Sequence, residues 1–194
     1  MNRKSQRLLA LMLFNQSHSK RIINGILKDM VANLGLHGSA KRIDVRDSVA
    51  VELISKAKSK GLTPEELEAK ANHDIAAKTP VPKGENDPHF MLQLCSVYAE
   101  YVKVCKRNNA LDFDDLLMFG VKLLKEEPSC IDYEHVFVDE FQDTNTTQLE
   151  LMIQFAARSG NVSVVGDPDQ SSKCSARRFL QDLTLVSIWM EVCR

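Results

Sequence analysis

The sequence HVFVDEFQDTNTTQLE, residues 135–150, decides the fold class of this chain. Val136–Val138 is short and apolar, which is typical of a strand, and a helix is expected over residues 147–157. A second apolar strand is expected at residues 162–165. Strands that are apolar throughout, without alternation, favour burial in a parallel sheet between helices. We therefore predict a strand, helix, strand unit of an α/β fold, in which ligands bind beyond the carboxyl ends of the strands.

The chain before residue 135 is predicted to be mostly helical. The strongest local signal is Thr63-Pro64-Glu65-Glu66, which combines an N-cap, a proline in the first turn and a capping-box glutamate. Apolar residues recur at helical spacing in most of the other segments. Helices are expected over residues 19–34, over 47–60, from Pro64 onward, from Pro88 to about residue 107, and over 111–127 before Pro128. The predicted fold class is therefore α/β with a high helical content.

Some apolar side chains in these segments are predicted to be buried. In the last of the helices Asp112 is expected to cap the helix, and the large apolar residues that follow are expected in the core. These residues are Phe113, Leu116, Leu117 and Phe119. The apolar run Leu8–Phe14 is too short to span a membrane and is expected to belong to an amphipathic helix.

The composition excludes several classes of protein. The chain has 194 residues and a formal net charge of -1, so it can form one domain or two small ones and carries no global signal for a polyanion. Its 5 cysteines form no CxxC pair, and their number does not suit a disulfide framework. An intracellular protein in a reducing compartment, with no membrane segment, is expected.

Polar motifs follow both predicted strands. Asp139 and Glu140 follow the first strand directly, and GDPDQS, with Gln170, follows the second. Hydrolysis of a terminal phosphate needs one carboxylate to hold Mg²⁺ and a second group to orient or deprotonate water. An amide at the same edge can respond to the presence of the phosphate. Each motif alone is also typical of a solvated turn, but the two together indicate a nucleotide-hydrolysing site.

On these two motifs, DEFQDTN and VVGDPDQS, the chain resembles the UvrD/Rep-type superfamily 1 DNA helicases, and most of all the fungal helicases that dismantle recombination intermediates. The resemblance implies ATP and Mg²⁺ as cofactors and single-stranded or partly duplex DNA as the partner. It implies that Asp139 holds Mg²⁺ and that Glu140 is the catalytic base. It further implies that Gln142 links the nucleotide to the DNA side, and that Gln170 binds the terminal phosphate as a sensor.

The resemblance also implies a division of the chain. The segment ALDFDDLL is similar to the stretch by which the chain of the family returns to its first motor domain. The expected divisions are an N-terminal segment of uncertain origin at 1–18, a helical 1B-like subdomain at 19–109, part of a RecA-like P-loop motor domain at 110–171, and a divergent tail at 172–194. The tail is expected to have no fixed packing place.

The sequence departs from the family in two places. It contains no GxxxxGK[ST] phosphate loop, and the residues after GDPDQS lack the aromatic pair that stacks on bases in the family. We therefore expect a fragment of an ATP-dependent 3′ to 5′ DNA helicase that acts in repair or recombination, in the nucleus if the source is eukaryotic, and that is inactive as an isolated chain. The alternatives are a non-enzymatic module that binds protein or DNA with a vestigial motor site, and a different nucleotide-hydrolysing protein of the same sheet type.

Overall fold

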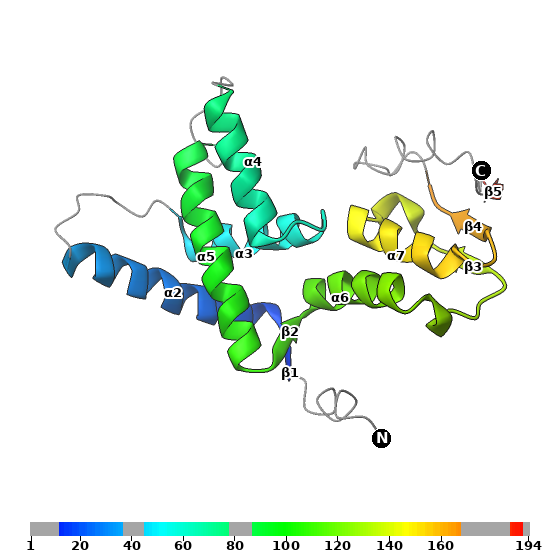
Figure 1. Ribbon diagram of the computed structural model, residues 1–194, viewed down its shortest axis with the longest axis horizontal. Helices are drawn as coiled ribbons and strands as arrows, with labels where there is room; N and C mark the ends of the chain where they lie inside the picture. Colours follow the sequence, from blue (N-terminus) through cyan, green and yellow to red (C-terminus); the bar gives the residue numbers. More distant parts are fainter. Residues whose placement is uncertain (1–11, 37–44, 78–86, 168–186, 192–194) are drawn as a thin grey trace. The chain divides into compact units, whose positions relative to one another are not determined.

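The computed structural model describes residues 12–36, 45–77, 87–167 and 187–191 (Figure 1). The chain forms two compact units, and each is built from two separate stretches of sequence. Unit 1 comprises Met1–Lys58 and Leu62–Asp115, and unit 2 comprises Ser59–Gly61 and Leu116–Arg194. The chain therefore leaves unit 1 directly after Lys58 and again directly after Asp115.

Unit 1 is built from helices, as its sequence predicts. The longest of them, α2 and α5, include the predicted ranges, and α4 and α5 lie side by side (Figure 1). The helices are α2 (Gln16–Leu36), α3 (Asp47–Lys58), α4 (Pro64–Ala76) and α5 (Pro88–Arg107). Their apolar faces form one core around the buried side chains of Ile23, Ile54, Leu94, Val97 and Tyr98. Each such side chain contributes about 1.5–3 kcal/mol when it leaves water.

Local capping fixes where two of the helices begin. Thr63 accepts a hydrogen bond from the backbone N–H of Glu66, whose carboxylate accepts one from Thr63 N in return, so the predicted capping box is confirmed. Asp112 and Asp115 make the same reciprocal pair at the start of α6 (Phe113–Glu126). The capping role predicted for Asp112 is therefore also confirmed.

The last three residues of the N-terminal apolar run do not form the helix that the sequence suggests. Met12–Phe14 is a strand, β1, which pairs in parallel with β2, Ala110–Asp112. Phe14 is buried in the core of unit 1, whereas Met12 and Leu13 are exposed. A run that is apolar at every position has no period, so tertiary pairing decides between helix and strand. Residues 1–11 lie outside the described residues.

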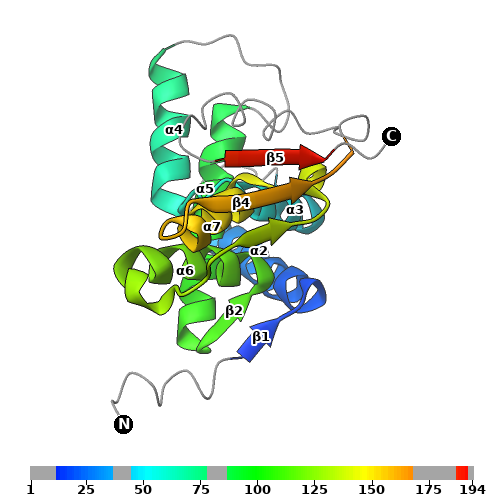
Figure 2. The same cartoon turned by 90° about the vertical axis from the view of Figure 1, so that its right-hand side faces the viewer.

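Unit 2 contains the predicted strand, helix, strand unit. Strand β3 (Val136–Val138), helix α7 (Thr146–Ala156) and strand β4 (Asn161–Val165) follow one another, and β3 pairs with β4 in parallel. Figure 2 shows these strands side by side with a third strand, β5. Val162 and Val164 point into a core formed with Leu149, Met152 and Ala156 of α7. The prediction of parallel strands packed on a helix is confirmed.

The C-terminal tail supplies the third strand. Ser187–Glu191, β5, pairs in parallel with β4, so the order of the sheet is β3, β4, β5. The expectation that residues 172–194 have no fixed packing place is therefore wrong for these five residues. The open backbone edge of β4 is a template for pairing, and such an edge recruits a strand from any suitable segment.

Helix α6 carries apolar side chains that its sequence predicts to be buried but that lie on the surface. Phe113 is 60% exposed, Phe119 is 50% exposed and Leu116 is 41% exposed, so the prediction is wrong for these three residues. Helix α6 still contacts α7, since a side chain at Gly120 would contact Leu151 and Lys125 Nζ lies 2.8 Å from Oε1 of Glu150. The amphipathic pattern is real, but only one face of the helix is covered by elements that the structure describes.

No helix in the described part of the chain is long and apolar enough to cross a membrane.

Candidate functional site

The acidic pair lies at the carboxyl end of β3, as predicted. Asp139 and Glu140 follow Val138 directly, and both side chains are exposed. Asp139 accepts a hydrogen bond on Oδ1 from the backbone N–H of Glu140, at 2.9 Å. Glu140 has a φ of 51°, in the left-handed region, which costs a residue with a side chain on the order of 1 kcal/mol. The backbone is thus held in an unfavourable conformation where the chain turns from β3 into the 3₁₀ turn Phe141–Asp143.

Gln142 connects this acidic pair with the end of β4. Its side chain is only 6% exposed. The amide nitrogen Nε2 donates to Oε2 of Glu140, and the carbonyl oxygen Oε1 accepts from the backbone N–H of Asp167, at 2.9 Å. Both polar ends of the amide are therefore used within the protein. We call Glu140, Gln142 and Asp167 the amide bridge.

The amide bridge requires a glycine at position 166. A Cβ atom at Gly166 would collide with Oε1 of Gln142 and would lie 3.1 Å from the backbone nitrogen of Phe141. A side chain at this position would displace the Gln142 amide and would also press on the Phe141 backbone. Gly166 therefore lets the chain after β4 approach the turn after β3 closely enough to form the bridge.

The structure brings together three of the four residues predicted for the site. Asp139, Glu140 and Gln142 lie on one continuous turn, and Gln170 lies outside the described residues. Gly166 and the backbone of Asp167 are two members of the site that sequence reasoning missed. The signal was present in the tight-turn motif GDPDQS, but a motif does not reveal which neighbouring backbone a glycine must approach.

The carboxylates suit Mg²⁺ that is already bound to phosphates, and they do not form a metal cage. Mg²⁺ in nucleotide sites is held by one or two carboxylates together with waters and phosphate oxygens. Asp139 offers an exposed carboxylate of this kind. Among the described residues no group of three or more His, Cys, Asp or Glu side chains could hold a metal by itself. The donor set therefore fits a metal that arrives with a nucleotide.

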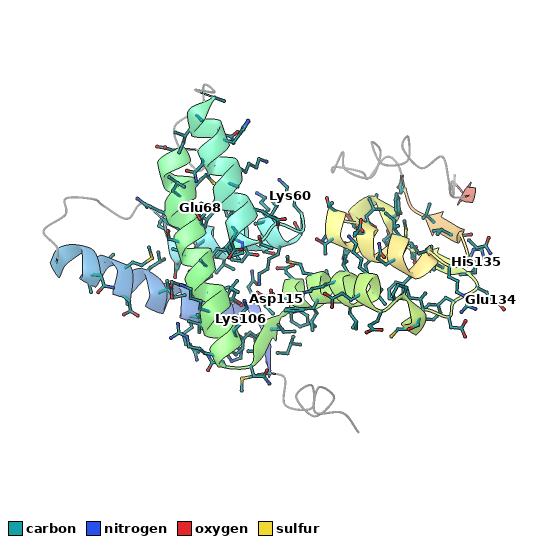
Figure 3. The ribbon with its side chains drawn as sticks, in the orientation of Figure 1. Lys60, Glu68, Lys106, Asp115, Glu134 and His135 are labelled. Carbon is teal, nitrogen blue, oxygen red and sulfur yellow. The ribbon has the colours of Figure 1, made fainter. Side chains whose placement is uncertain are left out.

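The amino end of β3 is not part of this site. Glu134 and His135 lie there, at the opposite end of the strand from Asp139 (Figure 3). His135 Nε2 lies 2.9 Å from Oγ of Ser163 on β4, and its ring stacks on Phe137 with centroids 4.3 Å apart. The contact with Ser163, and the hydrogen bond that Asn161 Nδ2 donates to the backbone oxygen of Glu134 at 3.1 Å, tie β4 to this end of β3.

Unit 1 contains a second cluster of carboxylates, which surrounds a buried lysine. The Nζ atom of Lys58 lies 2.6 Å from Oδ2 of Asp112 and 2.6 Å from Oδ1 of Asp115, and the Lys58 side chain is 1% exposed. Tyr101 donates its O–H to Asp112 at 3.0 Å, and Ser19 Oγ lies 2.8 Å from the same Tyr101 oxygen. Figure 3 shows Asp115 at the start of α6. We call Ser19, Lys58, Tyr101, Asp112 and Asp115 the lysine cluster.

The lysine cluster shifts the pKa values of its members in opposite directions. Burial tends to raise the pKa of Asp112, but the Lys58 ammonium and its hydrogen bond outweigh burial and hold that pKa below its usual range. For Asp115, burial together with repulsion from Asp112 exceeds the attraction of Lys58 and raises the pKa. One lysine shared by two carboxylates thus fully stabilises only one of the two negative charges.

Comparison with known proteins assigns the family. The family model described as UvrD/REP helicase N-terminal domain matches residues 2–172, and the chain belongs to this family. The match confirms the predicted resemblance. It also includes residues 2–18, which carry no recognised motif but contain strand β1.

Among individual proteins, the chain is similar to several much longer helicases. It is 41% identical over 122 residues to the ATP-dependent DNA helicase SRS2 of Saccharomyces cerevisiae, an alignment that covers 61% of this chain and 9% of that protein. It is 35% identical over 155 residues to the ATP-dependent DNA helicase PcrA of Bacillus subtilis, covering 77% of this chain and 18% of PcrA. The chain therefore spans only a small part of the length of these relatives.

Proposed function

We propose that this chain supplies the hydrolytic carboxylates of an ATP-dependent DNA helicase that moves 3′ to 5′ in repair or recombination. The observation that carries the proposal is the exposed pair Asp139 and Glu140 at the carboxyl end of a parallel strand, bridged to the end of the next strand, in a chain of the UvrD/REP family. Its relatives are named as ATP-dependent DNA helicases. By this proposal the chain acts inside the cell, and in the nucleus if its source is eukaryotic.

The residues divide the chemistry as follows. Asp139 would hold Mg²⁺, which neutralises charge on the terminal phosphates, and Glu140 would accept a proton from the attacking water. Gln170 would contact the terminal phosphate, and Gln142 would connect the nucleotide site with the rest of the motor. By the same proposal residues 19–109 correspond to a 1B-type subdomain, and residues 110–171 correspond to part of a RecA-like motor domain.

The proposed DNA partner has few candidate contacts on the chain. Basic side chains are exposed on α2 and near the end of α5, where Figure 3 labels Lys106. Lys103 already pairs with Glu100 at 2.6 Å, which reduces the charge available there. We therefore expect weak binding to single-stranded DNA that does not depend on sequence and that is lost as salt rises.

The test is to place this segment in a complete helicase. A chimera of Bacillus subtilis PcrA, with its matching segment replaced by the matched residues of this chain, should hydrolyse ATP in response to single-stranded DNA. The variant Glu140→Gln should lower kcat by about 100-fold or more, because it removes the proposed base. The isolated chain should hydrolyse ATP only at background, since its sequence has no GxxxxGK[ST] loop.

The opposite results would reject the proposal. A folded chimera that binds DNA but does not hydrolyse ATP would show that this segment cannot serve a motor, which favours a binding module with a vestigial site. Hydrolysis that is insensitive to Glu140→Gln would assign the catalytic base to another residue.

A further inference from the structure

We propose that Gln142 is a positioning residue, which ties the carboxylate of Glu140 to the backbone that follows β4, and that it does not bind the nucleotide. This inference rests on the proposed function, because it describes how the proposed base of that site is held. It changes the role expected for Gln142 from a ligand of the nucleotide to an internal link between the two strand ends.

The direction of the amide follows from its partners. The backbone N–H of Asp167 can only donate, so it must face the carbonyl oxygen of Gln142. The NH₂ group then faces Glu140, whose carboxylate can only accept when ionised. A primary amide, with an acceptor oxygen and a donor nitrogen, satisfies both partners at once. With 6% of the side chain exposed and both ends engaged, little of Gln142 remains for a ligand.

Two strained or crowded positions hold the amide bridge together. Glu140 adopts a left-handed φ of 51°, and this conformation brings its side chain back to a residue only two positions later. Gly166 leaves the space that Oε1 of Gln142 occupies. A strained backbone at the end of β3 and the absence of a side chain at the end of β4 both allow Gln142 to form its two hydrogen bonds.

The amide bridge makes the position of Glu140 depend on the segment after β4. If Asp167 moves away, the carbonyl oxygen of Gln142 loses its hydrogen-bond donor, and the amide is no longer fixed in place against Glu140. The same segment continues toward Gln170, the residue proposed to contact phosphate. A displacement of the backbone at Asp167 would therefore alter the position of Glu140 through the Gln142 side chain alone, and the strands would not have to move.

Hydrogen exchange and NMR of the full chain test the bridge without any catalytic activity. Gln142→Met removes both hydrogen bonds and should speed exchange of the Asp167 amide proton by about tenfold. Gln142→Glu keeps an oxygen for Asp167 but replaces the donor to Glu140 with a like charge. It should leave Asp167 exchange within about threefold of the parent, and it should shift the carboxyl carbon resonance of Glu140.

Two further variants guard against a general loss of structure. Gln148→Met removes a side chain oxygen that caps α7 in the same unit, and it should leave Asp167 exchange and the Glu140 resonance unchanged. Gly166→Ala should reproduce the effects of Gln142→Met, because the new methyl group takes the place of Oε1. Unchanged exchange of Asp167 in both Gln142→Met and Gly166→Ala would overturn the proposal.

The chimera separates this inference from the proposed function. In it Gln142→Glu should lower kcat with little change in KM for ATP, since a positioning residue acts on the reacting group and not on binding. A rise in KM at constant kcat would make Gln142 a nucleotide ligand and would overturn the inference. A parent chimera without ATPase activity would reject the proposed function alone. The exchange measurements would still show whether Gln142 holds Glu140 and Asp167 together.

Discussion

The two units of the molecule use carboxylates in opposite ways. In unit 1 the side chains of Asp112 and Asp115 are only 13% exposed and share the ammonium group of Lys58. In unit 2 Asp139 and Glu140 are exposed at a strand end, and among the described residues no lysine or arginine forms an ion pair with either. The first pair is partly neutralised by a lysine of the chain itself, and the second leaves room for an external cation. Burial with a fixed partner marks a structural role, and exposure at a ligand edge marks a chemical one.

The largest effect is expected from breaking the lysine cluster. Lys58→Met leaves two buried carboxylates without their cation, which should lower the free energy of unfolding by about 3–5 kcal/mol. Urea denaturation followed by circular dichroism measures it. Lys56→Met is the matched control, because Lys56 lies on the same helix but its side chain is 61% exposed and its partner Glu52 is exposed as well. Equal losses from the two substitutions would mean that burial of Lys58 does not matter.

A smaller effect is expected from Tyr101→Phe, which removes one hydroxyl from the lysine cluster. Asp112 loses a donor and Ser19 loses its buried partner, so unfolding should become easier by about 1–3 kcal/mol. Tyr133→Phe serves as the comparison, since the Tyr133 side chain is exposed. The same denaturation experiment measures both. If Tyr101→Phe proved as harmless as the control, water or another group would have to satisfy Asp112.

The opposite pKa shifts predict how stability depends on pH. Asp112, with its lowered pKa, stabilises the fold above its unfolded pKa of about 3.9, and this contribution is lost as the pH falls below that value. Asp115, with its raised pKa, favours the fold more when protonated, so its contribution decreases as the pH rises above about 3.9. Asp115→Asn should therefore remove the increase in the free energy of unfolding on mild acidification. It should leave the decrease at lower pH, which comes from Asp112. Denaturation curves from neutral to acidic pH compare the two proteins, and parallel profiles would contradict the assignment.

The smallest effect on stability is expected at the acidic edge of unit 2. Asp139→Asn should change the free energy of unfolding by less than about 0.5 kcal/mol, because the side chain is exposed and has no charged partner among the described residues. Denaturation of the variant beside Lys58→Met measures the contrast between the two carboxylate pairs directly. A loss above about 1 kcal/mol would show that Asp139 supports the fold as well as the site.

The sequence predicts the elements whose signals are local. The capping box at Thr63, the apolar strand Val136–Val138 and the helix after it depend on residues within a few positions of each other, and all are confirmed. Strands β1, β2 and β5 were missed, and residues 111 and 112 of β2 were expected to be helical, because each strand consists of a few residues whose state depends on a partner far along the chain. Short apolar runs have no period that separates helix from strand.

The site was predictable in its residue types but not in its connections. An acidic pair after a strand indicates its chemistry, whereas the contact of Gln142 with Asp167 depends on two turns meeting in space. The lysine cluster gave no signal at all. A lysine at the end of a helix is usually solvated, and nothing near Lys58 in the sequence announces Asp112 or Asp115 as its partners.

The pairing of β1 with β2 sets an order for folding. Met12 aligns with Ala110, so the small sheet closes a loop of about 100 residues. Closing such a loop costs chain entropy before the contacts that stabilise it are made. We therefore expect this pairing to form late. Lys58 likewise waits for Asp112, which is the last residue of β2. During synthesis on the ribosome the helices α2 to α5 can collapse early, yet the N-terminal strand and the buried lysine stay unsatisfied until Ala110–Asp115 has emerged. The same six residues, 110–115, therefore supply the partners of both β1 and Lys58, and we expect both contacts to form in one late step.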